Sequence, residues 1–344
     1  MNKQQREFYK IFAEHGSGDA KVTITAKELI LLLHICYVDL YNQRSSWMED
    51  DFWVLAEKGL YQTSYGEIIA LPEKTEDECF NLMESCGVLD ANNIIFLYMK
   101  NLSDLYRRRF KYHFILKNQP FPSTEQIGPR SLLEYGNCED GLLADWLEWR
   151  KWIYDIDNRS AQETGYVFEP ILSSCLGGES VSATYSPVKR IDERGKKTSN
   201  GRQIDCYLKE KKEVYELKMR VTIAASGQGR FKEEMSFPYE AHCAGLKPIL
   251  VVFDDNISPL LASLKAQYEK YNGQVFIGKD AWNLLEERAG KEMSIFISKY
   301  IFPPVNAMDN LMHSSPHNIA LERNENKIII KNHNAEYVIE RNEE

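Results

Sequence analysis

The first part of the chain carries apolar residues at the spacing of an amphipathic helix. They recur every three or four positions, which places them on one helical face. The stretches 27–41, 77–87, 93–115 and 142–156 show this pattern most clearly, and prolines at 120, 122 and 129 separate the last two. We therefore expect residues 1–157 to be mainly α-helical, with a hinge or linker near the prolines.

From residue 158 onward, helix-like and strand-like segments alternate. A short helix over 167–178, stopped by two glycines, is followed by strand-like alternation at 180–190, a loop at 191–201 and a hairpin within 203–220. A helix over 230–245, interrupted or bent at Pro238, precedes a buried type of strand at 248–253. The order αβββαβ predicts an α/β fold with a mixed sheet flanked by helices.

Three regions follow from these patterns. Further helices and a strand at 258–301 extend the α/β segment, and residues 327–340 show one more hairpin pattern. A chain of 344 residues suffices for one large domain or two ordinary ones. We expect a helical N-terminal region at 1–157, an α/β core at 158–304 and a C-terminal extension at 305–344.

The hairpin QIDCYLKEKKEVYELKMR (203–220) brings acidic residues together. With a two-residue turn at Glu210 and Lys211, the register places Asp205 directly opposite Glu216. Alternation then puts Asp205, Glu216 and Lys218 on one face of the hairpin. The other face holds the apolar residues Ile204, Cys206, Leu208, Tyr215, Leu217 and Met219, and we expect it to be the core side.

Two opposed carboxylates on neighbouring strands lie about 5 Å apart. They repel each other unless a cation lies between them, and Mg²⁺ takes oxygen ligands of this kind. Lys218 on the same face can orient a water molecule or stabilise developing charge, a combination suited to phosphodiester hydrolysis. The alternative is a solvated hairpin face, since an aspartate followed by Glu-x-Lys occurs by chance in many chains.

Composition narrows the classes of function. The net charge of −9 argues against a passive nucleic-acid binder, but not against an enzyme with positive charge in one cleft. No uncharged run approaches the ~18 residues of a membrane span. The N-terminal residues lack the apolar core of a secretion signal, so we expect a cytoplasmic protein without a membrane segment. Seven scattered cysteines without Cys-x-x-Cys spacing indicate reduced thiols.

Basic residues on either side of the hairpin are candidates for DNA contact. The segment that follows it carries Arg220, Gln228, Arg230 and Lys232, and arginine and glutamine are suited to base edges. The preceding loop carries Lys189, Arg190, Lys196, Lys197 and Arg202, which we interpret as phosphate contacts. The alternatives are a flexible loop for the first set and a solvated charge run for the second.

On these residues the segment resembles the PD-(D/E)XK nuclease superfamily, and within it the type II restriction endonucleases. In that superfamily the fold is αβββαβ, an aspartate opens the second strand, and the (D/E)XK triplet lies on the third. Asp205 and Glu216-Leu217-Lys218 match these positions, although Ile204 replaces the usual proline. The stretches 159–178 and 218–238 also resemble the ApaLI-like family of restriction endonucleases.

The resemblance implies that Asp205, Glu216 and the backbone carbonyl of Leu217 bind the metal and that Lys218 is the catalytic lysine. Glu169 would be a further acidic site residue; otherwise it is an ordinary glutamate on a helix surface.

The implied function is Mg²⁺-dependent, sequence-specific cleavage of double-stranded DNA by a homodimer, which leaves 5′-phosphate and 3′-hydroxyl ends. The N-terminal region would clamp DNA, read bases or build the dimer. The alternatives are a structure-specific repair, recombination or mobile-element nuclease, and a non-catalytic DNA-binding protein.

Overall fold

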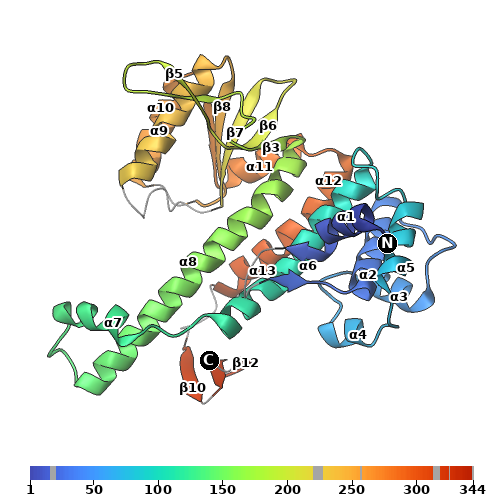
Figure 1. The fold of residues 1–344 in the computed structure, drawn as a ribbon, viewed down its shortest axis with the longest axis horizontal. Helices are drawn as coiled ribbons and strands as arrows, with labels where there is room; N and C mark the ends of the chain where they lie inside the picture. Colours follow the sequence, from blue (N-terminus) through green and yellow to red (C-terminus); the bar gives the residue numbers. More distant parts are fainter. Residues whose placement is uncertain (16–20, 220–227, 256–257, 313–317, 325, 343–344) are drawn as a thin grey trace. The chain divides into compact units, whose positions relative to one another are not determined.

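The chain forms two compact units, residues 1–164 with 306–344 and residues 165–305 (Figure 1). The computed structural model describes residues 1–15, 21–219, 228–255, 258–312, 318–324 and 326–342. Among the described helices, none combines the length and the apolar character that crossing a membrane requires. The cysteines are free thiols, and five of them are buried: Cys36, Cys79, Cys86, Cys175 and Cys206.

The first unit is mainly helical, as its periodicity predicts. Its helices are α1 (Lys3–Ala13), α2 (Ala26–Tyr41), α3 (Asp50–Lys58), α4 (Tyr65–Ile69), α5 (Glu76–Ser85), α6 (Ile94–Asn118), α7 (Thr124–Ile127), the 3₁₀ turn η2 (Gly128–Leu133) and the first part of α8 (Asp140–Leu176). Helices α2, α4 and α5 begin with capping boxes at Thr25, Ser64 and Thr75. In each box the glutamate three residues further on accepts a hydrogen bond from the backbone N–H of the capping residue. A short ladder joins β1 (Glu14–His15) to β2 (Val22–Thr23).

Helix α8 is a single element of 37 residues and contains both the 142–156 and the 167–178 segments. The prediction of a separate short helix at 167–178 is therefore wrong. Residues 157–166 hold no proline, and Gly165 alone does not end the helix. The two predicted glycines do end it, since Gly177 adopts a φ of +78°.

The C-terminal residues form a three-stranded antiparallel sheet in the first unit. Strands β10 (Ala320–Asn324), β11 (Lys327–Lys331) and β12 (Glu336–Glu340) follow α13 (Phe302–Met312), so the predicted hairpin exists and gains one strand. Ile328 and Ile339 pack in a cluster with Ile115, Trp152 and Ile156 of α6 and α8. The extension thereby covers apolar surface of these two helices.

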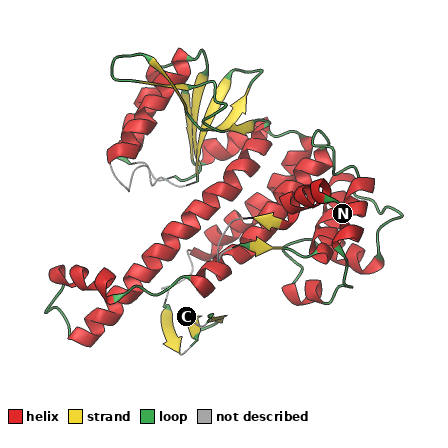
Figure 2. Ribbon diagram, viewed as in Figure 1, coloured by secondary structure: helices red, strands yellow, loops and turns green. Residues whose placement is uncertain are grey.

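A mixed five-stranded sheet forms the centre of the second unit (Figure 2). Its order is β3 (Glu179–Val181), β6 (Ile204–Leu208), β7 (Glu213–Lys218), β8 (Lys247–Val252) and β9 (Gln274–Ile277). The pairs β3–β6 and β6–β7 are antiparallel, whereas β7–β8 and β8–β9 are parallel. The predicted mixed sheet is confirmed, with β7 as its middle strand.

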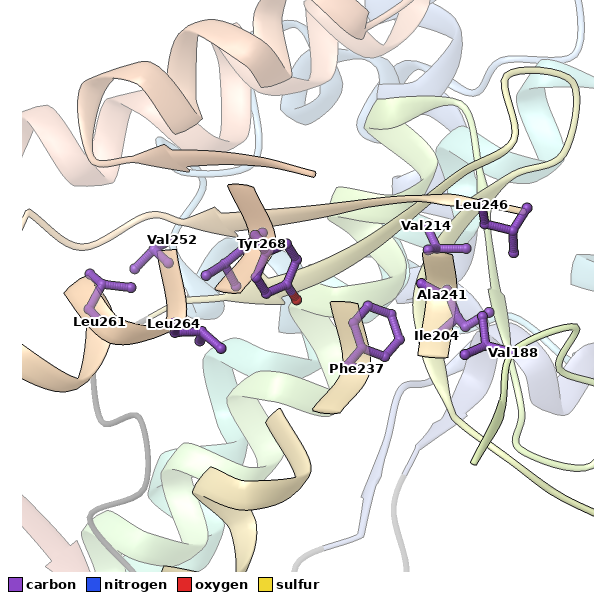
Figure 3. Packing of buried hydrophobic residues seen from close by; sticks show 11 residues of the cluster. Val188, Ile204, Val214, Phe237, Ala241, Leu246, Val252, Leu261, Leu264 and Tyr268 are labelled. Carbon is purple, nitrogen blue, oxygen red and sulfur yellow. The ribbon is translucent and has the colours of Figure 1, made fainter. Parts of the chain in front are cut away.

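Helices α9 (Gln228–Cys243) and α10 (Pro259–Lys270) pack on one face of the sheet. Figure 3 shows the buried cluster between these helices and the sheet. It includes Val214 and Val252 from the sheet and Phe237, Leu264 and Tyr268 from the helices. Pro238 lies inside α9, which continues through it. Helices α11 (Lys279–Arg288), α12 (Lys291–Phe296) and a π-helical turn (Ile297–Ile301) complete the unit.

Both faces of the β6–β7 hairpin are covered, which differs from the expectation of one core side. Ile204 belongs to the cluster under α9 and α10, together with Val214, rather than to the opposite face. On that opposite face Cys206 lies 3.9 Å from the carbonyl oxygen of Ser173 in α8. Strand β7 also pairs in parallel with β8, and strands in parallel pairs are usually buried on both sides.

The segment predicted as one strand at 180–190 is instead a turn between two short strands. β3 ends at Val181, and β4 (Lys189–Ile191) pairs with β5 (Lys197–Gly201) in a separate hairpin, so the loop at 191–201 is half strand. A Cβ on Gly201 would lie 2.0 Å from the carbonyl oxygen of Ala183. The turn and this hairpin are packed together through that glycine.

Candidate active site

The register of the β6–β7 hairpin follows the sequence prediction. The paired residues are Cys206 with Tyr215, Tyr207 with Val214, and Leu208 with Glu213. One step further in the same register, Asp205 lies opposite Glu216. There the Oδ2 atom of Asp205 accepts a hydrogen bond from the Leu217 N–H at 2.9 Å, so a side chain continues the ladder beyond its last backbone pair.

Asp205 is a buried carboxylate. Only 7% of its surface is exposed, and the Ser180 hydroxyl donates to its backbone carbonyl at 2.8 Å. Burial raises the pKa of Asp205 well above its usual range, and the charges of Glu216 and Glu169 raise it further. The Leu217 N–H opposes this change. Such a group is costly to ionise unless a cation approaches it.

Lys218 lies among carboxylates at the end of β7. Its Nζ atom is 2.7 Å from Oε1 of Glu216 and 3.5 Å from Oε1 of Glu234 on α9. Burial alone would lower the pKa of Lys218, but the two glutamates outweigh it and leave that pKa above its usual value. The ammonium is therefore fully charged at neutral pH.

These side chains border a cavity of about 350 Å³ within the second unit. Its lining comes from α8, β4, β6, β7, α9 and α10 and comprises Glu169, Arg190, Arg202, Gln203, Asp205, Glu216, Lys218, Glu233, Glu234, Phe237, Leu264 and Tyr268. The structure thus brings the four predicted residues Glu169, Asp205, Glu216 and Lys218 to one cavity. Burial raises the pKa of Glu169, and Glu216 raises it further, whereas Lys218 lowers it.

The donor set suits a hard divalent cation. Within the described ranges, no group of three or more His, Cys, Asp or Glu side chains is close enough to enclose a metal. Mg²⁺ needs no such cage, since it keeps several waters and binds one or two protein carboxylates. Asp205 and Glu216 are the pair that could hold it, because a cation between them would offset their mutual repulsion.

The predicted basic residues lie in different surroundings. Lys189, Arg190, Lys196 and Lys197 are on the β4–β5 hairpin, where Arg190 pairs with Glu233 at 2.8 Å and Lys197 donates to the Cys243 carbonyl at 3.0 Å. Arg202 is buried, and its guanidinium donates to Glu240, to Ser236 and to the Glu233 carbonyl. Lys232 is exposed on α9. Arg220 and the side chains of Gln228 and Arg230 lie outside the described residues.

Sequence reasoning missed Glu234 and Tyr268 as members of the cavity lining. Glu234, Phe237 and Ala241 follow one another at helical spacing, and the last two are core residues of α9. An acidic residue on the apolar face of a helix was the signal that could have identified Glu234. Tyr268 had no comparable signal, since an aromatic residue at helical spacing is normally core.

The chain is similar to known proteins over most of its length. A model of the ApaLI-like restriction endonuclease family matches residues 58–302. The chain is also 41% identical over 311 residues to the type II restriction enzyme ApaLI of Acetobacter pasteurianus, covering 88% of this chain and 81% of that enzyme. No solved structure matches. The extent of both matches shows that this chain belongs to the ApaLI-like restriction endonuclease family.

Proposed function

We propose that this restriction endonuclease hydrolyses double-stranded DNA at the cavity between β6, β7 and α9, with Mg²⁺ as cofactor. The observation that carries the proposal is the register that sets buried Asp205 against Glu216, with Lys218 on the same strand. Asp205 and Glu169 border the same cavity and both have a raised pKa, which is typical of functional sites. The burial of the Asp205 carboxylate favours this proposal over the alternative of a solvated hairpin face.

We also propose that the second unit is a PD-(D/E)XK core. The end of α8, strands β3, β6 and β7, helix α9 and strand β8 give the order αβββαβ, with the β4–β5 hairpin as an insertion. Asp205 lies near the start of the second strand of this order, and Glu216-Leu217-Lys218 ends the third. These placements support the assignment of the superfamily motif to these residues.

Asp205 and Glu216 would hold the metal, and the Leu217 carbonyl would assist. In a strand, the N–H and C=O of one residue point to the same edge. Because the Leu217 N–H reaches Asp205, the Leu217 carbonyl points to the side of β7 where Asp205 lies. When bound, Mg²⁺ supplies a Lewis acid for a phosphoryl oxygen and lowers the pKa of a coordinated water.

The side chains of the cavity then serve phosphodiester hydrolysis. Water oxygen forms the new bond to phosphorus and the bond to the 3′ oxygen breaks, which leaves a 5′-phosphate and a 3′-hydroxyl. The Lys218 ammonium places positive charge where the pentavalent phosphate gains negative charge. Glu169 on α8 faces the same cavity and contributes to its negative potential.

For DNA contact we propose the basic residues on either side of the β6–β7 hairpin. Lys189, Arg190, Lys196 and Lys197 lie on the β4–β5 hairpin, and Arg190 also borders the cavity. Such residues contact phosphates, whereas Arg220, Gln228, Arg230 and Lys232 belong to the segment that we propose reads bases. We leave Arg202 out of this set, because its guanidinium is buried against α9.

We further propose that the enzyme is a homodimer joined through η2 and the first half of α8. Leu132, Leu133, Tyr135, Leu142, Trp146 and Tyr154 are each more than half exposed. Residues 121–157 carry eight acidic and three basic side chains, which disfavours DNA as the partner. A two-fold pairing of the helix with itself would bury these apolar side chains in both copies.

Light scattering after size exclusion tests the dimer. The double variant Leu142→Asp with Trp146→Asp should elute as a folded monomer, whereas the wild-type chain should have twice that mass. A monomeric wild-type protein, or a dimeric double variant, would refute the assignment of this surface.

Digestion of a sequenced plasmid with Mg²⁺, followed by mapping of the ends, tests the proposed function. We expect cuts at one short duplex sequence, with a 5′-phosphate and a 3′-hydroxyl at each end. Cuts that follow branched or single-stranded structure would favour the repair or mobile-element alternative. Stable binding without cuts in any divalent cation would favour a non-catalytic DNA-binding protein.

A further inference from the structure

The ammonium of Lys218 is shared between two carboxylates of different elements. Glu216 lies two residues before it on β7, with its Oε1 atom at 2.7 Å from Nζ. Glu234 approaches from α9, with its Oε1 atom at 3.5 Å. The strand therefore supplies one partner and the packed helix supplies the other.

These two partners are in different situations once a metal binds. Glu216 belongs to the pair that would hold the cation, so the ammonium and the cation compete for the same carboxylate. A carboxylate that turns toward a divalent ion loses much of its bond to a neighbouring ammonium, since the two positive charges repel each other. Without a second anion, Lys218 would leave the cavity or weaken the binding of the metal.

We propose that Glu234 is a positioning residue that keeps the Lys218 ammonium in the cavity when Glu216 turns to the metal. The inference rests on the proposed function, and it concerns a residue outside the Asp205 and Glu-x-Lys pattern. Glu234 acts through Lys218 rather than as a metal ligand. Removing its charge leaves Glu216 as the carboxylate that must serve both cations.

The backbone around Glu234 is well suited to this role. Phe237 and Ala241, which follow at helical spacing, are buried in the cluster of Figure 3 and fix the rotation of α9. The side chain of Glu234 is 21% exposed, whereas that of its neighbour Glu233 is 51% exposed and pairs with Arg190. A side chain that is already partly buried on a packed helix has less freedom left to lose when it holds an ammonium.

A double-mutant cycle on the full-length chain tests the inference, with Mn²⁺ as the probe and free Mn²⁺ measured by electron paramagnetic resonance. Glu234→Gln should weaken Mn²⁺ binding about tenfold in the wild-type background, the usual size for a residue that supports a ligand. In a Lys218→Met background the same change should have an effect of less than about twofold. Glu234→Asp should recover part of the loss.

Glu269→Gln is the matched control, since Glu269 pairs with Lys265 at 3.9 Å on the exposed side of α10. It should leave Mn²⁺ binding and cleavage unchanged.

Two results would overturn the inference. Equal losses from Glu234→Gln in both backgrounds would make Glu234 a ligand, and no loss in either would leave it without a role. Failure of the proposed function has a different signature, a wild-type protein that neither binds Mn²⁺ nor cuts DNA, and it would overturn the inference as well.

Discussion

Asp205→Asn removes an ionisable carboxyl group from the buried end of β6 and preserves the shape of the side chain. The amide oxygen can still accept the Leu217 N–H, which lies 2.9 Å from Oδ2 in the native protein. Burial and the charges of Glu216 and Glu169 hold the pKa of Asp205 well above its usual range. A carboxyl group with a raised pKa costs folding free energy at neutral pH in the metal-free protein, so its replacement by an amide should stabilise the second unit.

The size of the effect follows from the geometry of the hairpin. Two negative charges about 5 Å apart repel by about 3 kcal/mol at an effective dielectric constant of about 20. Lys218 offsets part of that repulsion. We expect a net gain of about 1 to 3 kcal/mol, or roughly 3 to 9 °C in the Tm of this unit.

The pH dependence has a definite sign. A carboxyl group with a raised pKa in the folded state stabilises the protein fully only below its unfolded pKa, and that stability is lost as pH rises through the folded pKa. The difference in Tm between Asp205→Asn and the wild type should thus be large at pH 8 and small near pH 4. Added Mg²⁺ should reduce the difference at pH 8, since it stabilises the wild type alone.

Differential scanning calorimetry in EDTA, repeated with Mg²⁺, measures these shifts. Asp280→Asn serves as the control, because Asp280 is exposed on α11 of the same unit. It should change the Tm little or lower it slightly. A variant Asp205→Asn that is less stable than the wild type at pH 8 would refute the buried-charge account of this site.

Three further predictions concern stability. Burial lowers the pKa of His34 to about 4, so the free energy of unfolding of the first unit should fall by about 3 kcal/mol as pH falls from about 6.5 to 4. Urea titrations of His34→Gln should show a smaller decrease. Arg202→Met leaves the 3% exposed Glu240 without its guanidinium partner and should cost about 3 to 5 kcal/mol by urea unfolding, whereas replacing both residues with apolar ones should cost less. Gly201→Ala places a Cβ 2.0 Å from the Ala183 carbonyl oxygen and should cost more than about 2 kcal/mol; an unchanged midpoint would mean that the turn moves freely.

The sequence predicted the parts of the site that depend on local geometry. The register of a hairpin follows from its turn and from alternation, so the opposition of Asp205 and Glu216 could be counted along the chain. Lys218 follows from the same count. The order of helices and strands was also largely readable, because apolar periodicity reports burial directly.

The remaining features depend on contacts between distant segments. The basic loop around Arg202 predicts a phosphate contact, whereas its partner in the structure, Glu240, lies 38 residues away on α9. Glu234 reaches Lys218 only because α9 packs on the sheet face that carries the hairpin carboxylates. The sequence predicts two helices where the structure has the single α8, because polar residues separate the apolar stretches 142–156 and 167–178.

Cleavage of a duplex that contains the mapped site, under single-turnover conditions with Mg²⁺, tests the proposed active site directly. Wild-type protein is compared with Glu216→Ala and Lys218→Ala, and Glu269→Ala is the control. We expect each site variant to lose at least about a thousandfold in rate while still binding the duplex, and we expect the control to cut normally. Cleavage by Glu216→Ala at the wild-type rate would mean that the metal and the reaction lie elsewhere in the chain.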